Sequence, residues 1–138
     1  MYNICTIWFI YNFMTKEDMS ERLTTFAVRI VKMVDSIPAT VSGTAIARQI
    51  VRSGTSPSAN YRAACLAKSD KDFLNKLKMV EEELDETNHW IDILMRSQLV
   101  SANRLQPLYL EGRELVSIVV KSIISTKARM TAHDIEKK

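Results

Sequence analysis

Two groups of residues in this sequence carry side chains that could do chemistry. Glu86 and His89 are three positions apart, in the E-x-x-H spacing that carboxylate-bridged di-iron bundles use. Such a site needs a second E-x-x-H pair on another helix and two further inward glutamates. The other histidine, His133, has Met130 at the position where the glutamate is required. The pattern therefore predicts no di-iron site, and we expect His89 at the surface or at a subunit contact.

Cys65 is the second candidate, as a nucleophile. Arg62 and Lys68 lie about one helical turn away on either side and could lower the pKa of the thiol. The neighbouring alanines instead are typical of a helix-packing position, where a small buried thiol is ordinary. The sequence contains no Gly-rich phosphate loop, nucleophile elbow or paired-carboxylate site. We predict that the protein is not an enzyme and uses no cofactor and no metal ion.

The spacing of apolar residues predicts the elements that must position these side chains. Apolar residues recur at alternating four- and three-residue steps, which is typical of helices with one buried side. The predicted helical segments cover residues 19–37, 44–68 and 73–94, and a fourth begins at Ala102 or Pro107 and ends near Ala128. We therefore expect an all-α, antiparallel up-down four-helix bundle over residues 15–130, followed by a polar tail at 131–138.

The second segment contains an interruption, Ser53-Gly54-Thr55-Ser56-Pro57. Glycine weakens a helix, and proline cannot donate a backbone hydrogen bond. We expect either a bent helix or two short helices, with Ser56 as the cap of the second and Pro57 in its first turn.

The fourth segment is apolar around much of its circumference. Beyond one ordinary stripe it carries further apolar residues, Val116, Ile118, Val120, Ile123 and Ile124. A helix that is apolar nearly all round is normally buried nearly all round. A single bundle of this size leaves one side of each helix in water, so these residues predict a covering partner subunit.

The first fourteen residues are apolar and uncharged. They lack the basic region and cleavage site of a secretory signal, and they are too short to span a bilayer. Three interpretations stay open: a segment docked on the bundle, a weak membrane anchor, or an extension upstream of a natural start at Met14. We favour the last, because Thr15 and the acids Glu17 and Asp18 have the pattern of a helix start.

Length and composition fit one globular domain. The chain has 138 residues with a net charge of +3, and its two cysteines form no disulfide framework, so we expect a cytoplasmic protein. Charge is nevertheless segregated, with residues 44–78 strongly basic and residues 79–98 strongly acidic. The basic residues could bind nucleic-acid phosphates through Arg48, Arg52, Arg62, Lys68 and Lys71. Alternatively they pair with the acidic helix, within the chain or between subunits, which we favour because Tyr61 is the only clear aromatic among them.

Three stretches carry a family resemblance: residues 48–64, 72–77 and 80–90. The first contains the distinctive residues Ser53, Gly54, Thr55, Ser56, Asn60, Tyr61 and Arg62. They closely resemble the bacterial four-helix-bundle proteins related to the 23S rRNA intervening-sequence proteins. The resemblance implies a homo-oligomeric ring, a pentamer, without catalytic residues, and distant relatives that bind nucleic acid through a basic face. Our leading hypothesis is a non-enzymatic, homo-oligomeric interaction scaffold, and the alternative is an RNA- or DNA-binding module.

Overall fold

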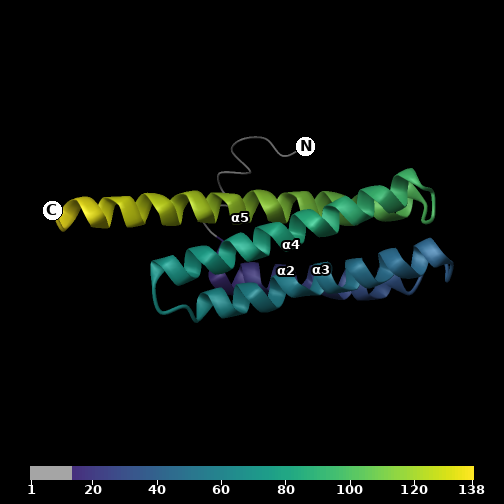
Figure 1. The fold of residues 1–138 in the computed structure, drawn as a ribbon, viewed down its shortest axis with the longest axis horizontal. Coiled ribbons are helices and arrows are strands. Elements are labelled where there is room, and N and C mark those ends of the chain that lie inside the picture. The colour runs from purple at the N-terminus through teal and green to yellow at the C-terminus, as the bar shows by residue number, and fades with distance from the viewer. Residues whose placement is uncertain (1–13) are drawn as a thin grey trace.

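The protein folds as an all-α bundle of four helices in its described part. The structure, a computed structural model, describes residues 14–138, so the predictions made for residues 1–13 lie outside the described residues. The helices are α2 (Lys16–Val34), α3 (Val41–Cys65), α4 (Asp70–Arg96) and α5 (Ala102–Glu136). Consecutive helices run antiparallel and are joined by short connections (Figure 1). The predicted up-down four-helix bundle is confirmed.

A hydroxyl side chain begins each helix. Thr15, Thr40, Ser69 and Ser101 each accept a hydrogen bond from the backbone N–H three residues further on. At α2 the Asp18 carboxylate also accepts from the Thr15 backbone N–H, which completes a capping box. These bonds satisfy amides that a helix start leaves without an intrahelical partner. The helix start predicted at Thr15 is thus confirmed.

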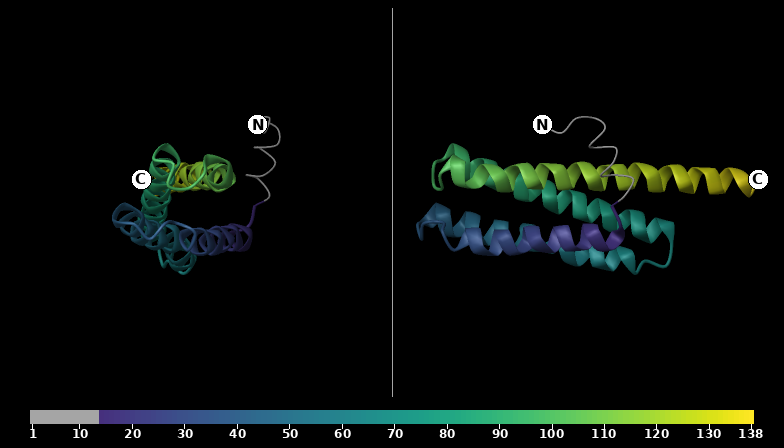
Figure 2. Two further views of the ribbon diagram at one scale, coloured as in Figure 1. Left: turned by 90° about the vertical axis from the view of Figure 1, so that its right-hand side faces the viewer. Right: turned by 180° about the vertical axis from the view of Figure 1, so that it is seen from behind.

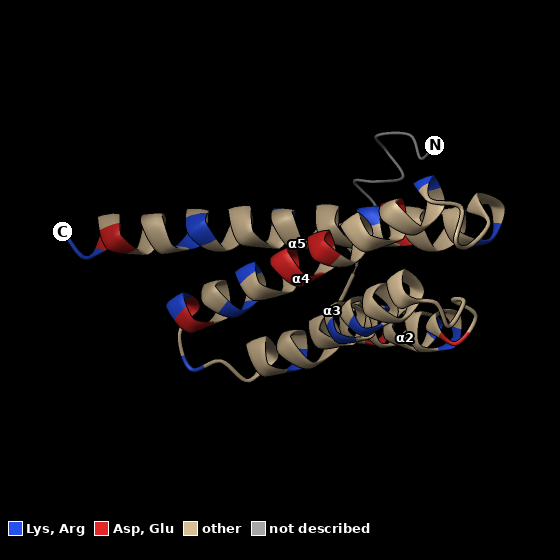
Figure 3. Ribbon diagram, turned by 45° about the vertical axis from the view of Figure 1, so that its right-hand side comes forward, with Lys and Arg blue, Asp and Glu red and all other residues tan. Residues whose placement is uncertain are grey.

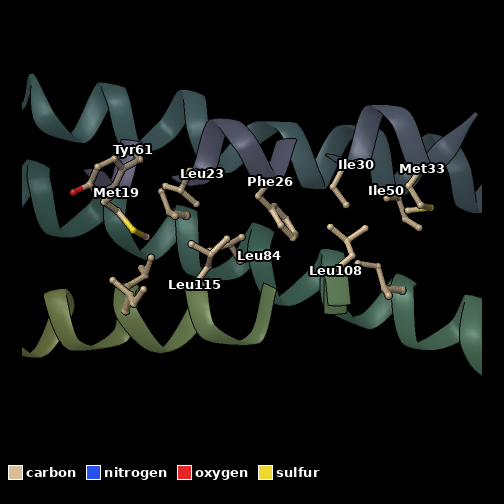
Figure 4. Close-up of a cluster of buried hydrophobic side chains, with 14 of the residues drawn as sticks. Met19, Leu23, Phe26, Ile30, Met33, Ile50, Tyr61, Leu84, Leu108 and Leu115 are labelled. Carbon is tan, nitrogen blue, oxygen red and sulfur yellow. The ribbon is translucent and has the colours of Figure 1, made fainter. Parts of the chain in front are cut away.

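The core is made of the predicted apolar stripes. Leu23 and Phe26 of α2, Leu84 of α4 and Leu115 of α5 gather at its centre (Figure 4) and are essentially inaccessible to solvent. The stripes contribute further buried side chains: Met19, Ile30, Ile37, Leu77, Val80, Thr87, Ile91, Leu94, Leu108 and Val119. The apolar period therefore identified most of the core, but it did not include Ile50, Leu74 and Leu105, and it left Ile118 and Ile123 to a subunit interface although both are buried here.

α3 differs from the prediction at its interruption. It is a single α-helix from Val41 to Cys65 with Pro57 inside it, so the alternative of two short helices capped by Ser56 is wrong. Proline removes the hydrogen bond to the carbonyl four residues earlier, which here belongs to Ser53. Ser53, Gly54 and Pro57 are all buried. Packing against the neighbouring helices therefore maintains α3 where this hydrogen bond is missing.

α5 is longer than predicted. It begins at Ala102 as expected, but it continues to Glu136 instead of ending near Ala128. The apolar stripe stops near that residue, whereas no glycine or proline follows to end the helix. Arg129 still reaches the body, where it pairs with Asp70 at the start of α4. Beyond it the helix projects past the other three (Figures 1 and 2), and residues 131–138 are exposed.

Small residues bring some of the helices close together. A Cβ atom added at Gly54 would lie 2.8 Å from two carbons of Ile30 on α2. On the α4 side of α3, the Thr87 hydroxyl donates to the Ser53 hydroxyl over 2.9 Å, and both residues are fully buried. α3 is therefore held closely on two sides, against α2 and against α4.

α2 and α5 meet along a much shorter stretch than the other neighbouring helices. Arg22 connects them, with Nε 2.7 Å from one oxygen of Glu111 and Nη2 3.0 Å from the other. The same guanidinium contacts Glu114 at 2.7 Å. The Glu111 hydrogen bonds raise the pKa of Arg22, so the guanidinium stays charged in this half-buried site.

Candidate interaction surfaces

The residues predicted to bind phosphates lie in two places. Arg48, Arg52 and Arg62 are exposed on α3, and their spacing places them roughly on one side of the helix. Arg48 and Arg62 are about 21 Å apart along the axis, at 1.5 Å per residue. Lys68 lies in the connection between α3 and α4, and Lys71 follows in the first turn of α4, both exposed. The structure therefore groups Arg62, Lys68 and Lys71 at one end of the bundle, away from Arg48.

Arg52 is engaged within the chain. Its Nη1 lies 2.9 Å from a carboxylate oxygen of Glu83, and its Nη2 donates to Glu86. The hydrogen bond from Arg52 holds the pKa of Glu86 below its ordinary value, and a weaker bond from the Trp90 indole acts in the same direction. For this residue the structure shows the predicted pairing between the basic segment and the acidic helix.

The residues that carry the family resemblance have mainly structural contacts. Ser53 and Gly54 face neighbouring helices inside the bundle, and Tyr61 is also buried. Thr55 donates to the Val51 carbonyl one turn earlier at 2.6 Å, and Ser56 accepts from the Asn60 amide at 3.0 Å. Arg62 alone among the seven is exposed. Ser53 and Gly54 thus pack α3 against its neighbours, whereas the bonds of Thr55 and Ser56 lie within α3 itself.

The five apolar residues predicted to form a subunit interface are divided by the structure. Ile118 and Ile123 are buried within the single chain, at 6% exposure each. Val116 and Val120 are half-buried, and Ile124 is 61% exposed. Part of the apolar surplus of α5 is therefore used by the chain's own core, and the remainder lies at the surface.

A groove between α4 and α5 was not anticipated. It has a volume of about 460 Å³ and is lined by Lys78, Glu81, Glu82, Asp85, Val116, Ile123 and Lys127. Figure 3 shows the acidic turns of α4 midway along the helix and basic residues at its N-terminal end. The sequence signal for this groove was the acidic character of residues 79–98. Two acids of that segment, Glu83 and Glu86, do not line the groove and pair with Arg52 instead. We refer to it below as the α4–α5 groove.

A second feature missed from the sequence is an exposed leucine. Leu66, the C-cap of α3, is 82% exposed and lies between Arg62 and Lys68 in the chain. Beside it is a hollow lined by Lys16, Glu17, Ser20, Arg62, Cys65 and Leu66. We call Arg62, Leu66, Lys68 and Lys71 the basic end of the bundle. No sequence signal distinguished Leu66 from the core leucines, because it continues an apolar pattern.

The residues considered for catalysis are ordinary in their surroundings. His89 is exposed, with its ring edge-on to Trp90 at 5.1 Å between centroids. Cys65 is a half-buried free thiol. Within residues 14–138, no cluster of His, Cys, Asp and Glu is arranged to hold a metal ion. None of the helices described for this chain has the length and hydrophobicity that a membrane span requires.

Comparison with known proteins places this bundle in a family. The family described as 23S rRNA-intervening sequence protein matches residues 15–121. A similar solved structure is a protein of unknown function from the S23 ribosomal protein family of Bacteroides thetaiotaomicron VPI-5482, determined at 1.70 Å resolution. It is 30% identical, with a TM-score of 0.72 over 76% of this chain and 97% of the other. No curated protein matches the chain. The family match covers all of α2, α3 and α4 and more than half of α5, and the chain therefore belongs to the 23S rRNA-intervening sequence protein family.

Proposed function

We propose that this protein is a non-enzymatic, self-associating bundle that serves as an interaction scaffold in the cytoplasm. The observation that supports this most is the apolar surface that α5 retains after the core is filled. Ile124 is 61% exposed, next to the half-buried Val120 and close to the floor of the α4–α5 groove. Apolar surface bordered by charged residues is typical of protein–protein contacts. The family resemblance implies a ring of five copies.

Native mass spectrometry tests this proposal directly. We expect nuclease-treated protein at micromolar concentration to give one multimeric species, whose mass fixes the number of copies. Ile124→Asp places a charge on the proposed contact and should shift the protein to smaller species. Val28→Asp is the matched control, because Val28 is also an exposed β-branched apolar residue but lies on α2. A monodisperse monomer of the unmodified chain would overturn the proposal.

A second candidate function is binding of RNA or DNA. It is supported by four exposed bases, Arg48, Arg62, Lys68 and Lys71, which form no ion pair with any residue in the described part of the chain. Several copies in one assembly would multiply a weak phosphate-binding surface through avidity. Arg52 contributes less to such a surface, because Glu83 and Glu86 already neutralise its charge.

Fluorescence anisotropy with single-stranded RNA and duplex DNA tests this second function. Binding should weaken steeply as salt rises from about 50 to about 200 mM, because phosphate contacts release counterions. Arg48→Glu should weaken binding and reduce the salt dependence, whereas Lys32→Glu on α2 is the control of equal charge. Unchanged affinity and salt dependence in Arg48→Glu would exclude the α3 surface as the binding site.

A further inference from the structure

We propose that the basic end of one copy of this chain docks into the α4–α5 groove of a second copy. This inference rests on the self-association proposed above and names the two surfaces that would meet. Each surface has an apolar centre and charged surroundings, and the charges are opposite in sign.

The groove has an apolar floor and an acidic rim. Val116 and Ile123 of α5 form the floor, and Glu81, Glu82 and Asp85 of α4 line the same space. None of these three carboxylates forms an ion pair with any residue in the described range 14–138. Two lysines, Lys78 and Lys127, also line the groove and reduce its net charge to about −1.

The basic end presents an apolar side chain surrounded by positive charge. Leu66 is 82% exposed. A single exposed leucine is ordinary, but this one has three bases within five residues of it in the chain. Arg62, Lys68 and Lys71 are all exposed. The acids near them are Glu17 in the adjoining hollow, and Asp70 and Asp72, which pair with Arg129 and Lys76. The Leu66 side chain would contact Val116 and Ile123 in the groove, whose volume is about 460 Å³. The three bases would meet the acidic rim.

The two surfaces of one chain are held apart by α4 itself. Lys71 and Glu82 lie on the same helix, eleven residues or about 16 Å apart. The basic end therefore reaches only the groove of another copy. Because the two docking surfaces differ, the contact is heterologous. Each copy uses its basic end toward one neighbour and its groove toward the other, and a ring forms when the rotation between successive copies closes.

Charge reversal tests the pairing of these surfaces. The variant Arg62→Glu/Lys68→Glu/Lys71→Glu makes the basic end acidic, and Glu81→Lys/Glu82→Lys/Asp85→Lys makes the groove basic. Each variant alone then brings like charges together, and sedimentation velocity should show at least about a tenfold weaker association. In the mixture, a contact between the two different variants joins opposite charges, so the mixture should associate more strongly than either variant alone. The products should be open chains or even-numbered rings, because two alternating variants cannot close a ring of five.

Two further variants separate docking from general charge effects. Lys78→Glu/Lys127→Glu removes the two positive charges of the groove and should strengthen association. Arg29→Glu/Lys32→Glu/Arg104→Glu changes the net charge as much as the first variant, but its residues lie toward the opposite end of the bundle, and it should associate normally. Leu66→Ala should weaken association by about tenfold, as expected for loss of one buried leucine contact. Circular dichroism of each variant confirms that the fold is retained.

The outcomes distinguish this inference from the proposed function. If the unmodified protein is a monomer, self-association itself is wrong. If it associates and both charge-reversed variants associate equally well, self-association stands and these docking surfaces are wrong. Equal disruption by the Arg29/Lys32/Arg104 control would also overturn the inference, as would an effect that disappears after nuclease treatment.

Discussion

α3 and α5 meet their neighbours in different ways. α3 is packed through small buried residues: Gly54 against Ile30 of α2, and Ser53 against Thr87 of α4. α5 instead meets α2 along a short stretch, where Arg22 pairs with Glu111 beside the core, and it lines an open groove beside α4. The difference separates two roles. Close packing of α3 on two sides fixes the fold. α5 packs closely against α4 at Gly112, but its short contact with α2 and its groove beside α4 leave surface for a partner.

The largest expected effect is at the closest approach of α3. Gly54→Leu forces a side chain into the space that Ile30 occupies, and overpacking of this kind typically costs about 3 kcal/mol of unfolding free energy. Gly54→Ala should cost less, because its higher helix propensity returns about 1 kcal/mol. Urea unfolding followed by circular dichroism measures both. If the leucine variant is as stable as the unmodified protein, α3 is not closely packed against α2.

Thr87→Val tests the other side of α3. It removes the donor to Ser53 and leaves a buried hydroxyl without its partner, which costs about 1–3 kcal/mol. The double variant Ser53→Ala/Thr87→Val removes both hydroxyls and should be more stable than the single one. A double-mutant cycle in urea gives the interaction energy. Strict additivity of the two substitutions would show that the hydroxyls do not depend on each other.

Arg22→Met tests the α2–α5 contact, where we expect a smaller effect. It leaves Glu111 and Glu114 without their shared cation in a half-buried site, and we expect a loss of about 1–2 kcal/mol. Because the interaction is ionic, the difference from the unmodified protein should shrink in about 1 M salt, unlike that of Thr87→Val. A loss that is independent of salt would indicate that packing of the arginine stem, not its charge, joins α2 to α5.

The smallest effect is the pH dependence of the Arg52–Glu86 pair on the exposed side of α3. The pKa of Glu86 lies below its ordinary value of 4.5, chiefly because Arg52 donates to it. A carboxyl with a lowered pKa in the folded state stabilises the protein above its unfolded pKa, and this contribution is lost as pH falls through the folded pKa. Glu86→Gln should therefore lose slightly less stability between pH 7 and about pH 3. An identical acid dependence in both proteins would contradict the pairing.

Much of the fold could be predicted because each helix carries its own evidence. The stripe from Phe73 to Leu94 and the hydroxyl cap Thr15 depend on local periodicity and local hydrogen bonds. The continuity of α3 through Pro57 could not be predicted in this way. It depends on contacts with α2 and α4, residues far away in the sequence, which outweigh the local signal of Ser53–Pro57.

The interaction surfaces were predicted less completely than the core. The sequence identifies charged residues, but not which of them find partners. Arg52 is neutralised by Glu83 and Glu86, while Glu81, Glu82 and Asp85 on the same helix face a groove. Likewise Ile123 belongs to the core and its neighbour Ile124 to the surface. Successive residues are rotated by about 100° around a helix axis. A small error in assigning the buried face therefore turns a core residue into a predicted surface residue, or the reverse.

The projecting end of α5 has a consequence for dynamics. Met130 is the last residue of this helix that packs against the core; residues 131–138 are exposed, and the Ile135 side chain is 68% exposed. Helices shorter than about 12–15 residues are marginal in water by themselves, so these last turns fray unless something covers them. Amide hydrogens there should exchange with solvent far faster than those next to Leu115. Slow exchange in this segment would thus report a bound partner, residue by residue, without any label or substitution.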